Sequence, residues 1–563
     1  MNALTPIEAA AVRGSVEAGP DARTIRARRR LVLALNLVTI AALTASMVLL
    51  LSYRGIVPVE WAMLAAYVVT LPWLSIGLWN SLIGLWLDRR HGAGAAAHVT
   101  PALARITGDE PVAVRVAIVM PLRNEDPAAS IARLRGLQAA LDRTPWGAWF
   151  DYHVLSDTDR PAIAAREQEA VADWQREAPR AGIHYRRRTQ NTGYKAGNIA
   201  EFLHRTGDDY AYFLPLDADC VMGAEAVLRL VRVMEASPEI GLLQSLCTGL
   251  PSRTLFTRAF QFGMRHGMRS YTLGSAWWQA DCGPNWGHNA LIRTAPFRDH
   301  CMLPVLPGRG PLSGYILSHD QVEAALMRRA GLEVRVLAEE GESHEENPPS
   351  LADFVRRELR WCNGNLQYFR LLGMPGLLPV SRIQLYLAIQ MYLAAPAWML
   401  FILLGASTAA MPAQYEGIPA SLWVTLFAVV MVLNLMPKLM GLAQVLVDDA
   451  RSATYGGRLR VVTGGVAEFV LSTLIAPLVA FTLTLVTIGL RFGKRVGWDA
   501  QQRSRARLEW REAARVFWPH TLAGLALTVW IAALAPGALW IAAPLLISFV
   551  GAIPIAVGTT LPG

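Results

Sequence analysis

The sequence predicts an α/β domain, built on a mixed but mostly parallel sheet and inserted into a bundle of membrane helices. Two long apolar blocks lie near the N-terminus, and five more follow residue 380. Between them, apolar runs typical of strands alternate with helical patterns. The 563 residues are 53% hydrophobic with a formal charge of +9, which is too apolar for an ordinary soluble enzyme and too charged for a membrane bundle alone.

Each apolar block is long enough to cross about 30 Å of hydrocarbon as a helix. The blocks are 33–51, 59–86, 384–407, 418–446, 462–490, 517–535 and 537–558. They divide the chain into an N-terminal segment (1–32), a transmembrane hairpin (33–87), a soluble domain (88–380), a transmembrane bundle (381–490), a basic loop (491–515) and a C-terminal transmembrane hairpin (516–563).

Basic residues predict the orientation in the membrane. Five arginines between 23 and 30 precede the first block, so we expect both termini, the soluble domain and the loop 491–515 to be cytoplasmic. The block 462–490 then lies between two cytoplasmic loops, which favours an interfacial or re-entrant helix broken near Pro477. A violation of the positive-inside rule is the alternative. The long polar leader argues against a removable signal peptide.

The five cysteines all fall in the soluble domain, and no Cys-X-X-Cys pair occurs. An odd number without that spacing favours reduced thiols in a cytosolic compartment. A disulfide framework or a zinc site is not expected from this pattern.

Three apolar runs of the soluble domain end in polar turns. Their ends are Asn124-Glu125 after 116–120, Asp157 after 152–155, and Asp217-Ala218-Asp219 after 212–216. Helical patterns over 128–142, 160–178, 196–205 and 223–235 separate the runs. Strand–helix alternation predicts a parallel sheet, so the acidic turns should gather at one edge.

Asp217 and Asp219 would repel each other unless a cation lay beside them. Mg²⁺ or Mn²⁺ carrying a diphosphate fits this pair, because both ions take oxygen ligands and leave positions for phosphate. An ordinary Asp-X-Asp turn is the alternative.

Three further groups are candidates for the same site. Lys195, one of only three lysines, lies at the Gly-rich start of a predicted helix, where its ammonium could contact a diphosphate. A lysine that is simply exposed to solvent is the alternative. Asp320 lies at the start of a helical pattern, where an N-cap is also common. Arg360-Trp361 suits a leaving diphosphate and an acceptor sugar, or else an interfacial anchor.

The ordered set of motifs resembles the inverting family 2 glycosyltransferases, which include cellulose, hyaluronan and chitin synthases. Longer strings are similar to the synthases of osmoregulated periplasmic glucans. These strings are Trp286-Gly287-His288-Asn289, Ile316-Leu317-Ser318-His319-Asp320, Glu323 to Gly331, Glu345-Glu346 with Pro348-Pro349, and Arg360-Trp361-Cys362-Asn363-Gly364-Asn365. One departure is Arg357, which stands where processive members usually carry glutamine.

The resemblance implies a GT-A domain that binds UDP-glucose along the acidic edge. Asp157 would contact uridine, with Asn124 and Glu125 nearby and Lys195 at the diphosphate. Asp219, supported by Asp217, would hold Mg²⁺ (or Mn²⁺). Asp320 would be the catalytic base, with Arg360 offsetting charge on UDP and Trp361 packing on the acceptor.

The resemblance also implies a product and partners. The product would be a β-glucan, with a β-1,2 backbone favoured, exported across the bacterial inner membrane. Expected partners are the growing glucan, membrane lipid and a periplasmic glucan-biosynthesis protein G homologue; no nucleic acid is expected. Polar residues at membrane depth are candidate channel-lining groups, and 491–507 is a candidate gating loop. The lining candidates are Gln384, Tyr386, Gln390, Tyr392 and Glu468.

Two alternatives stay open. A cellulose-synthase-like enzyme or a transferase that loads a lipid acceptor would use the same donor site. A transporter whose soluble domain only senses UDP-sugars would not need a base and a leaving-group cation together.

Overall fold

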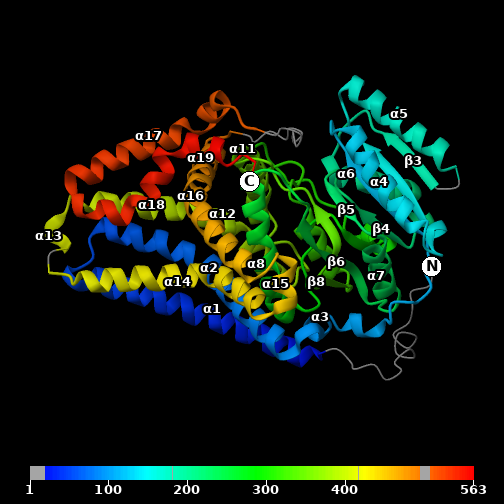
Figure 1. Ribbon diagram of the computed structural model, residues 1–563. Coiled ribbons are helices and arrows are strands. Elements are labelled where there is room, and N and C mark those ends of the chain that lie inside the picture. The colour runs from blue at the N-terminus through cyan, green and yellow to red at the C-terminus, as the bar shows by residue number, and fades with distance from the viewer. Residues whose placement is uncertain (1–19, 180–181, 416, 495–506, 563) are drawn as a thin grey trace.

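The computed structural model describes residues 20–179, 182–415, 417–494 and 507–562. A sheet domain and a group of long apolar helices form two connected parts (Figure 1). In this view the sheet domain lies on the right and the apolar helices on the left, with α8 (Leu255–Gln279) and α16 (Arg458–Arg491) between them.

The sheet domain is built on eight strands in the order β3-β2-β1-β4-β7-β6-β8-β5. Their bounds are β1 Val116–Leu122, β2 Phe150–Ser156, β3 Gly182–Arg187, β4 Tyr212–Pro215, β5 Cys220–Met222, β6 Ile240–Gly249, β7 Ala290–Arg293 and β8 Glu333–Glu345. The β1–β2, β1–β4, β2–β3 and β6–β8 pairs are parallel, and the other three are antiparallel. The predicted mixed, mostly parallel sheet is confirmed.

Strand register brings the acidic turns together. Leu122 at the end of β1 pairs with Ser156 at the end of β2, so Asn124 and Asp157 follow at the same sheet edge. β4 lies on the other side of β1 and runs parallel to it, so Asp217 leaves the sheet at that edge as well. The carboxyl ends of parallel strands therefore build the site, as the sequence predicts.

Helices cover both faces of this sheet. Alternate β1 residues face opposite sides, with Ile118 in one apolar cluster and Val119 in the other. The first cluster packs under α4 (Pro127–Leu141), α5 (Pro161–Glu177) and α7 (Ala224–Glu235). The second packs under α6 (Tyr194–Thr206), α9 (Thr294–His300) and α10 (Asp320–Arg329) and continues into the membrane helices. The face that carries α10 is thus joined to the membrane part by one apolar core.

Among the described residues, six helices are long and apolar enough to cross a membrane. They are α1 (Ala22–Leu51), α2 (Pro58–His91), α12 (Pro379–Thr408), α14 (Ala420–Val447), α16 and α17 (Trp510–Leu534). A seventh candidate is the pair α18 (Leu539–Val550) and α19 (Ala552–Gly558), which is bent by 65°. The second arm of the expected C-terminal hairpin is therefore broken. Short helices α3 (Ala95–Val99), α13 (Pro412–Tyr415) and α15 (Asp449–Thr454) complete the chain.

Two helices attach the sheet domain to the membrane part, α8 and α11 (Leu351–Leu366). A Cβ on Gly84 of α2 would lie 1.8 Å from the carbonyl oxygen of Ser270 in α8, so glycine permits the two backbones to touch. Asp88 at the end of α2 accepts from Arg269 of α8 and from Arg451 of α15. The first hairpin is thus joined directly to the sheet domain.

The helix α16 is a single unbroken helix, so the expected break near Pro477 is wrong. An internal proline removes one backbone hydrogen bond, and packing of the neighbouring Leu478 and Ala480 in an apolar cluster compensates. Both halves of α16 contact the sheet domain: Gly464 lies against Phe262 of α8, and Thr487 lies 3.9 Å from the Cys362 sulfur of α11.

The candidate lining residues have protein partners. Lys438 of α14 donates to Glu468 at 2.6 Å, and Gln384 donates to the Cys282 carbonyl at 2.5 Å. Tyr392 is 2% exposed and donates to Glu358, so it belongs to the core. Most of the candidate gating loop, 495–506, lies outside the described residues.

Candidate functional site

The loop after β1 is shaped by Asn124. Its backbone has φ +57°, a left-handed conformation that asparagine tolerates better than most residues. Its amide nitrogen Nδ2 donates to Asp159 at 2.8 Å, and its Oδ1 accepts from the Arg160 backbone at 3.2 Å. Asn124 therefore ties its loop to the loop after β2. Glu125 follows in the same turn and is half-buried.

Asp157 is held by Arg188, which the sequence analysis did not identify. The guanidinium makes two bonds to the carboxylate, Nε to Oδ1 at 2.6 Å and Nη2 to Oδ2 at 2.7 Å. The two side chains are only 6% and 5% exposed. Arg188 also donates to the Tyr194 carbonyl at 3.2 Å, which connects the pair to the start of α6.

A cavity of about 310 Å³ lies next to this pair. Arg188 lines it together with three other arginines and four polar or acidic residues. The full lining is Arg186, Arg187, Arg188, Thr189, Gln190, Thr192, Glu201 and Arg205. This end of the sheet edge is therefore strongly cationic.

Lys195, in the first turn of α6, contacts two elements at once. Its ammonium pairs with Asp217 after β4 and donates to the Gly287 carbonyl at 2.8 Å. Gly287 has φ +80°, and a Cβ there would lie 3.8 Å from the Lys195 nitrogen and 3.4 Å from the Asp320 Cβ. The glycine loop thus packs between Lys195 and Asp320, which brings Asp217 and Asp320 to the same place.

Asp219 lies two residues beyond Asp217 and is half-buried. Its backbone carbonyl accepts from the Glu346 amide at 3.0 Å, which fixes this turn against the end of β8. Its carboxylate accepts a weak contact from the Cys220 thiol at 3.8 Å. Because Lys195 pairs with Asp217, the two carboxylates have different electrostatic surroundings.

Asp320 is the first residue of α10, as predicted. Burial raises the pKa of its carboxyl and Glu323 raises it further, whereas the neighbouring His319 and Lys195 lower it; the net shift is upward. His319 Nδ1 lies 2.9 Å from Glu323, and Asn285 donates to the Asp320 carbonyl at 3.2 Å. The Asn285 bond holds the backbone of Asp320, and the raised pKa gives its carboxyl a higher affinity for a proton.

Arg360 and Trp361 lie on α11, which packs on the segment that leads into α10. A Cβ on Gly364 would lie 2.2 Å from Ser318 Oγ, and Arg360 is one turn earlier on the same side of the helix. Trp361 is 42% exposed, and the Arg357 guanidinium stacks 4.5 Å from its ring centre. Arg357 therefore extends the cationic and aromatic surface of Arg360-Trp361.

The structure thus links the predicted residues into one row. The row runs from the Asn124 loop through Asp157 and Arg188 to Lys195, Asp217 and Asp219, and then across Gly287 to Asp320 and α11. Arg188 and Gly287 are site residues whose place in the site the sequence did not reveal. Arg188 directly follows β3, and this position at the end of a strand was the signal that could have marked it as a site residue.

Two glycosyltransferase family models match this chain. The glycosyl transferase family 2 model matches residues 117–301, and the glycosyl transferase family group 2 model matches 212–437. Together the two matches extend over more than half of the chain. A mannosyltransferase from Pyrobaculum calidifontis, solved in complex with GDP-Man and Mn²⁺, is 14% identical with a TM-score of 0.37, over 69% of this chain and 99% of its own.

Curated relatives cover more of the chain. Glucans biosynthesis glucosyltransferase H of Pseudomonas aeruginosa is 37% identical over 522 residues, or 89% of this chain and 59% of that protein. The protein of the same name from Pseudomonas putida is 38% identical over 508 residues, or 86% and 58%. The chain spans about three fifths of the length of these relatives. With its mixed sheet, its ordered site residues and these matches, the chain belongs to glycosyltransferase family 2 and has the GT-A fold.

Proposed function

We propose that this protein is a membrane-embedded, inverting glucosyltransferase. It polymerises glucose from UDP-glucose into a β-glucan, with a β-1,2 backbone favoured, and passes the product across the bacterial inner membrane. The catalytic domain and both termini are cytoplasmic in this proposal, and a periplasmic glucan-biosynthesis protein G homologue is the expected partner.

One observation carries the proposal. A row of charged residues runs along the carboxyl edge of the sheet and ends at Asp320, a half-buried carboxyl with a raised pKa. A module that only sensed a sugar nucleotide would need the first part of that row. A group-transfer enzyme also needs a base, and in this proposal the base is Asp320.

The donor would lie along the row with uridine at Asp157 and the diphosphate towards Lys195. Asp219 fits a divalent cation, because its carboxylate offers hard oxygen ligands. Mg²⁺ or Mn²⁺ bound there would offset the charge that develops on UDP. Arg360 would add a second cation on the leaving-group side.

Asp320 would accept the proton of the acceptor hydroxyl. The hydroxyl oxygen forms a bond to the anomeric carbon of glucose as the bond to the UDP oxygen breaks, which inverts that carbon. Trp361, exposed and stacked with Arg357, offers a flat surface for the acceptor sugar.

The decisive experiment uses the full chain in membrane vesicles with labelled UDP-glucose. We expect a long glucan that β-specific glucanases degrade. Only lipid-linked sugar would favour a lipid-acceptor transferase, and no incorporation would favour a sensor or transporter. Linkage analysis of the product then tests the β-1,2 assignment.

The variant Asp320→Asn tests the base. It should lower kcat about 10²- to 10⁴-fold while UDP still binds, because the amide keeps the shape but cannot accept the proton. Normal polymerisation by this variant would refute the assignment.

A further inference from the structure

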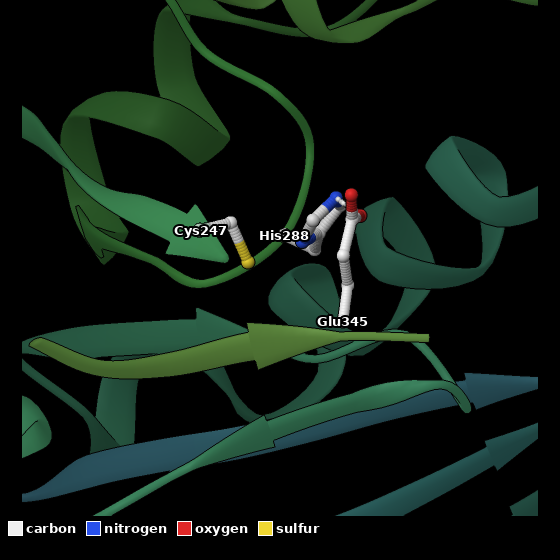
Figure 2. Close-up of side chains that lie close together, drawn as sticks. All are labelled: Cys247, His288 and Glu345. Atoms are coloured by element: carbon white, nitrogen blue, oxygen red, sulfur yellow. Dashed lines mark ion pairs between the residues drawn. The ribbon is translucent and has the colours of Figure 1, made fainter. Parts of the chain in front are cut away.

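A second group of metal-ligating side chains lies beside the candidate active site and has no role in the mechanism above. It consists of Cys247 at the end of β6, His288 in the loop before β7, and Glu345 at the end of β8 (Figure 2). One ligand atom from each residue lies within 4.8 Å of the other two. Figure 2 shows the three side chains pointing toward one another from separate elements.

We propose that Cys247, His288 and Glu345 bind a zinc ion. Thiolate, imidazole and carboxylate together are typical zinc ligands, whereas Mg²⁺ and Ca²⁺ prefer oxygen alone. Three protein ligands leave one position of a tetrahedron for water or another group. The proposal concerns metal binding only and does not depend on the identity of the sugar donor.

Two side chains donate to the Cys247 sulfur. The Asn289 amide donates at 3.3 Å, and Ser343 Oγ donates at 3.7 Å. Partners of this kind orient the ligands in known metal sites. An ordinary buried thiol in an apolar core needs neither of them.

Asn289 is fully buried and has a left-handed backbone, with φ +52°, which asparagine adopts more readily than most residues. Its carbonyl accepts from Ser245 at 2.6 Å. Its side-chain amide donates to the Cys247 sulfur and, at 2.9 Å, to Ser343 Oγ, so it lies between the two.

Strand pairing explains why the ligands meet and why spacing along the sequence could not show it. β8 lies between β5 and β6, so Glu345 pairs in register with Cys220 on one side and Gly249 on the other. His288 Nε2 lies 3.5 Å from the Glu345 carboxylate, and its Nδ1 lies 3.3 Å from the Cys220 sulfur. The ligand set therefore contains no short cysteine motif.

The test uses the purified full chain in detergent, without added nucleotide. We expect about one zinc per chain by elemental analysis, retained in excess Mg²⁺. Replacement by Co²⁺ should give a thiolate-to-cobalt charge-transfer band, which Cys247→Ser abolishes. The control Cys301→Ser alters another buried thiol, in the apolar cluster under α9, and should keep the band.

A second, less disruptive variant keeps the test usable if Cys247→Ser fails to fold. Ser343→Ala removes a donor to the sulfur and the oxygen that accepts from the Asn289 amide, and should weaken Co²⁺ affinity about 10- to 100-fold. The proposal is overturned if Co²⁺ gives no charge-transfer band, if the band survives Cys247→Ser, or if Ser343→Ala binds Co²⁺ as tightly as the unaltered chain. Because these readouts need no sugar donor, their failure is distinct from failure of the glucosyltransferase assay.

Discussion

At one end of the candidate site, Asp157 and Arg188 form a two-bond ion pair with side chains only 5% and 6% exposed. At the other end, Asp217, Asp219 and Asp320 remain half-buried at the surface of the row, with Lys195 among them. We call these the nucleotide end and the reaction end. At the first, the Asp157 carboxylate is neutralised by a buried arginine, whereas the second presents carboxylates whose charge a ligand, a cation or a proton can change.

The two ends should therefore respond differently to substitution. A buried, paired carboxylate contributes to fold and orientation, and removing its partner leaves an uncompensated charge. Half-buried carboxylates can exchange water for a cation or a proton at lower cost. We therefore expect stability effects at the nucleotide end and activity effects at the reaction end.

The largest stability effect is expected for Arg188→Met. It leaves the Asp157 carboxylate buried without its partner, which should cost about 3–5 kcal/mol of unfolding free energy. The matched control is Arg205→Met, whose side chain is 65% exposed in its pair with Glu201 and should cost less than about 1 kcal/mol. Thermal unfolding of the two variants in detergent measures the contrast. Equal midpoints would mean that burial of the pair has no structural importance.

At the reaction end, Lys195→Met should affect turnover more than folding. The variant removes the cation that pairs with Asp217 and contacts the Gly287 loop. Loss of a charged hydrogen bond of this kind should lower kcat/KM for UDP-glucose about 10- to 100-fold. Lys195→Arg keeps the charge and should recover part of the loss. Unchanged kinetics in Lys195→Met would remove the lysine from the proposed donor site.

The pH dependence of kcat tests the assignment of Asp320 as the base, because the direction of each expected shift is known. A base acts when deprotonated, so the raised pKa of Asp320 means that kcat falls as the pH drops through that pKa. His319 lowers this pKa and Glu323 raises it. His319→Gln should therefore move the acid limb to higher pH and Glu323→Gln should move it to lower pH. Shifts of both variants in the same direction would contradict the assignment of Asp320.

The smallest effect is expected in the loop at Gly287, which packs against Asp320. Gly287→Ala places a Cβ in a left-handed conformation against Asp320 and should cost about 1–2 kcal/mol of stability. Gly310→Ala adds the same methyl group in open space and should be neutral within about 0.5 kcal/mol. Unfolding midpoints and kcat of both variants show whether the loop is sensitive to its glycine.

Prediction from sequence succeeded where short-range pattern decides the outcome. Alternation of apolar runs and helical segments located β1, β2 and β4 with their helices, and the start of α10 at Asp320 followed from its helical pattern. The break expected near Pro477 was wrong, because a proline interrupts one hydrogen bond while packing from other helices holds the turn. Such packing is not visible in a local pattern.

By itself, the sequence determined which segments form strands, helices and apolar spans, because residue periodicity and turn chemistry act over a few residues. It also determined that acidic turns would gather at one sheet edge, since parallel strands end together. Only the tertiary structure decided which cation meets each carboxylate: Arg188 meets Asp157, and Lys195 meets Asp217. Those pairings depend on strand order, and the second also on a loop far along the chain whose Gly287 carbonyl accepts from Lys195, and no short-range rule contains that information.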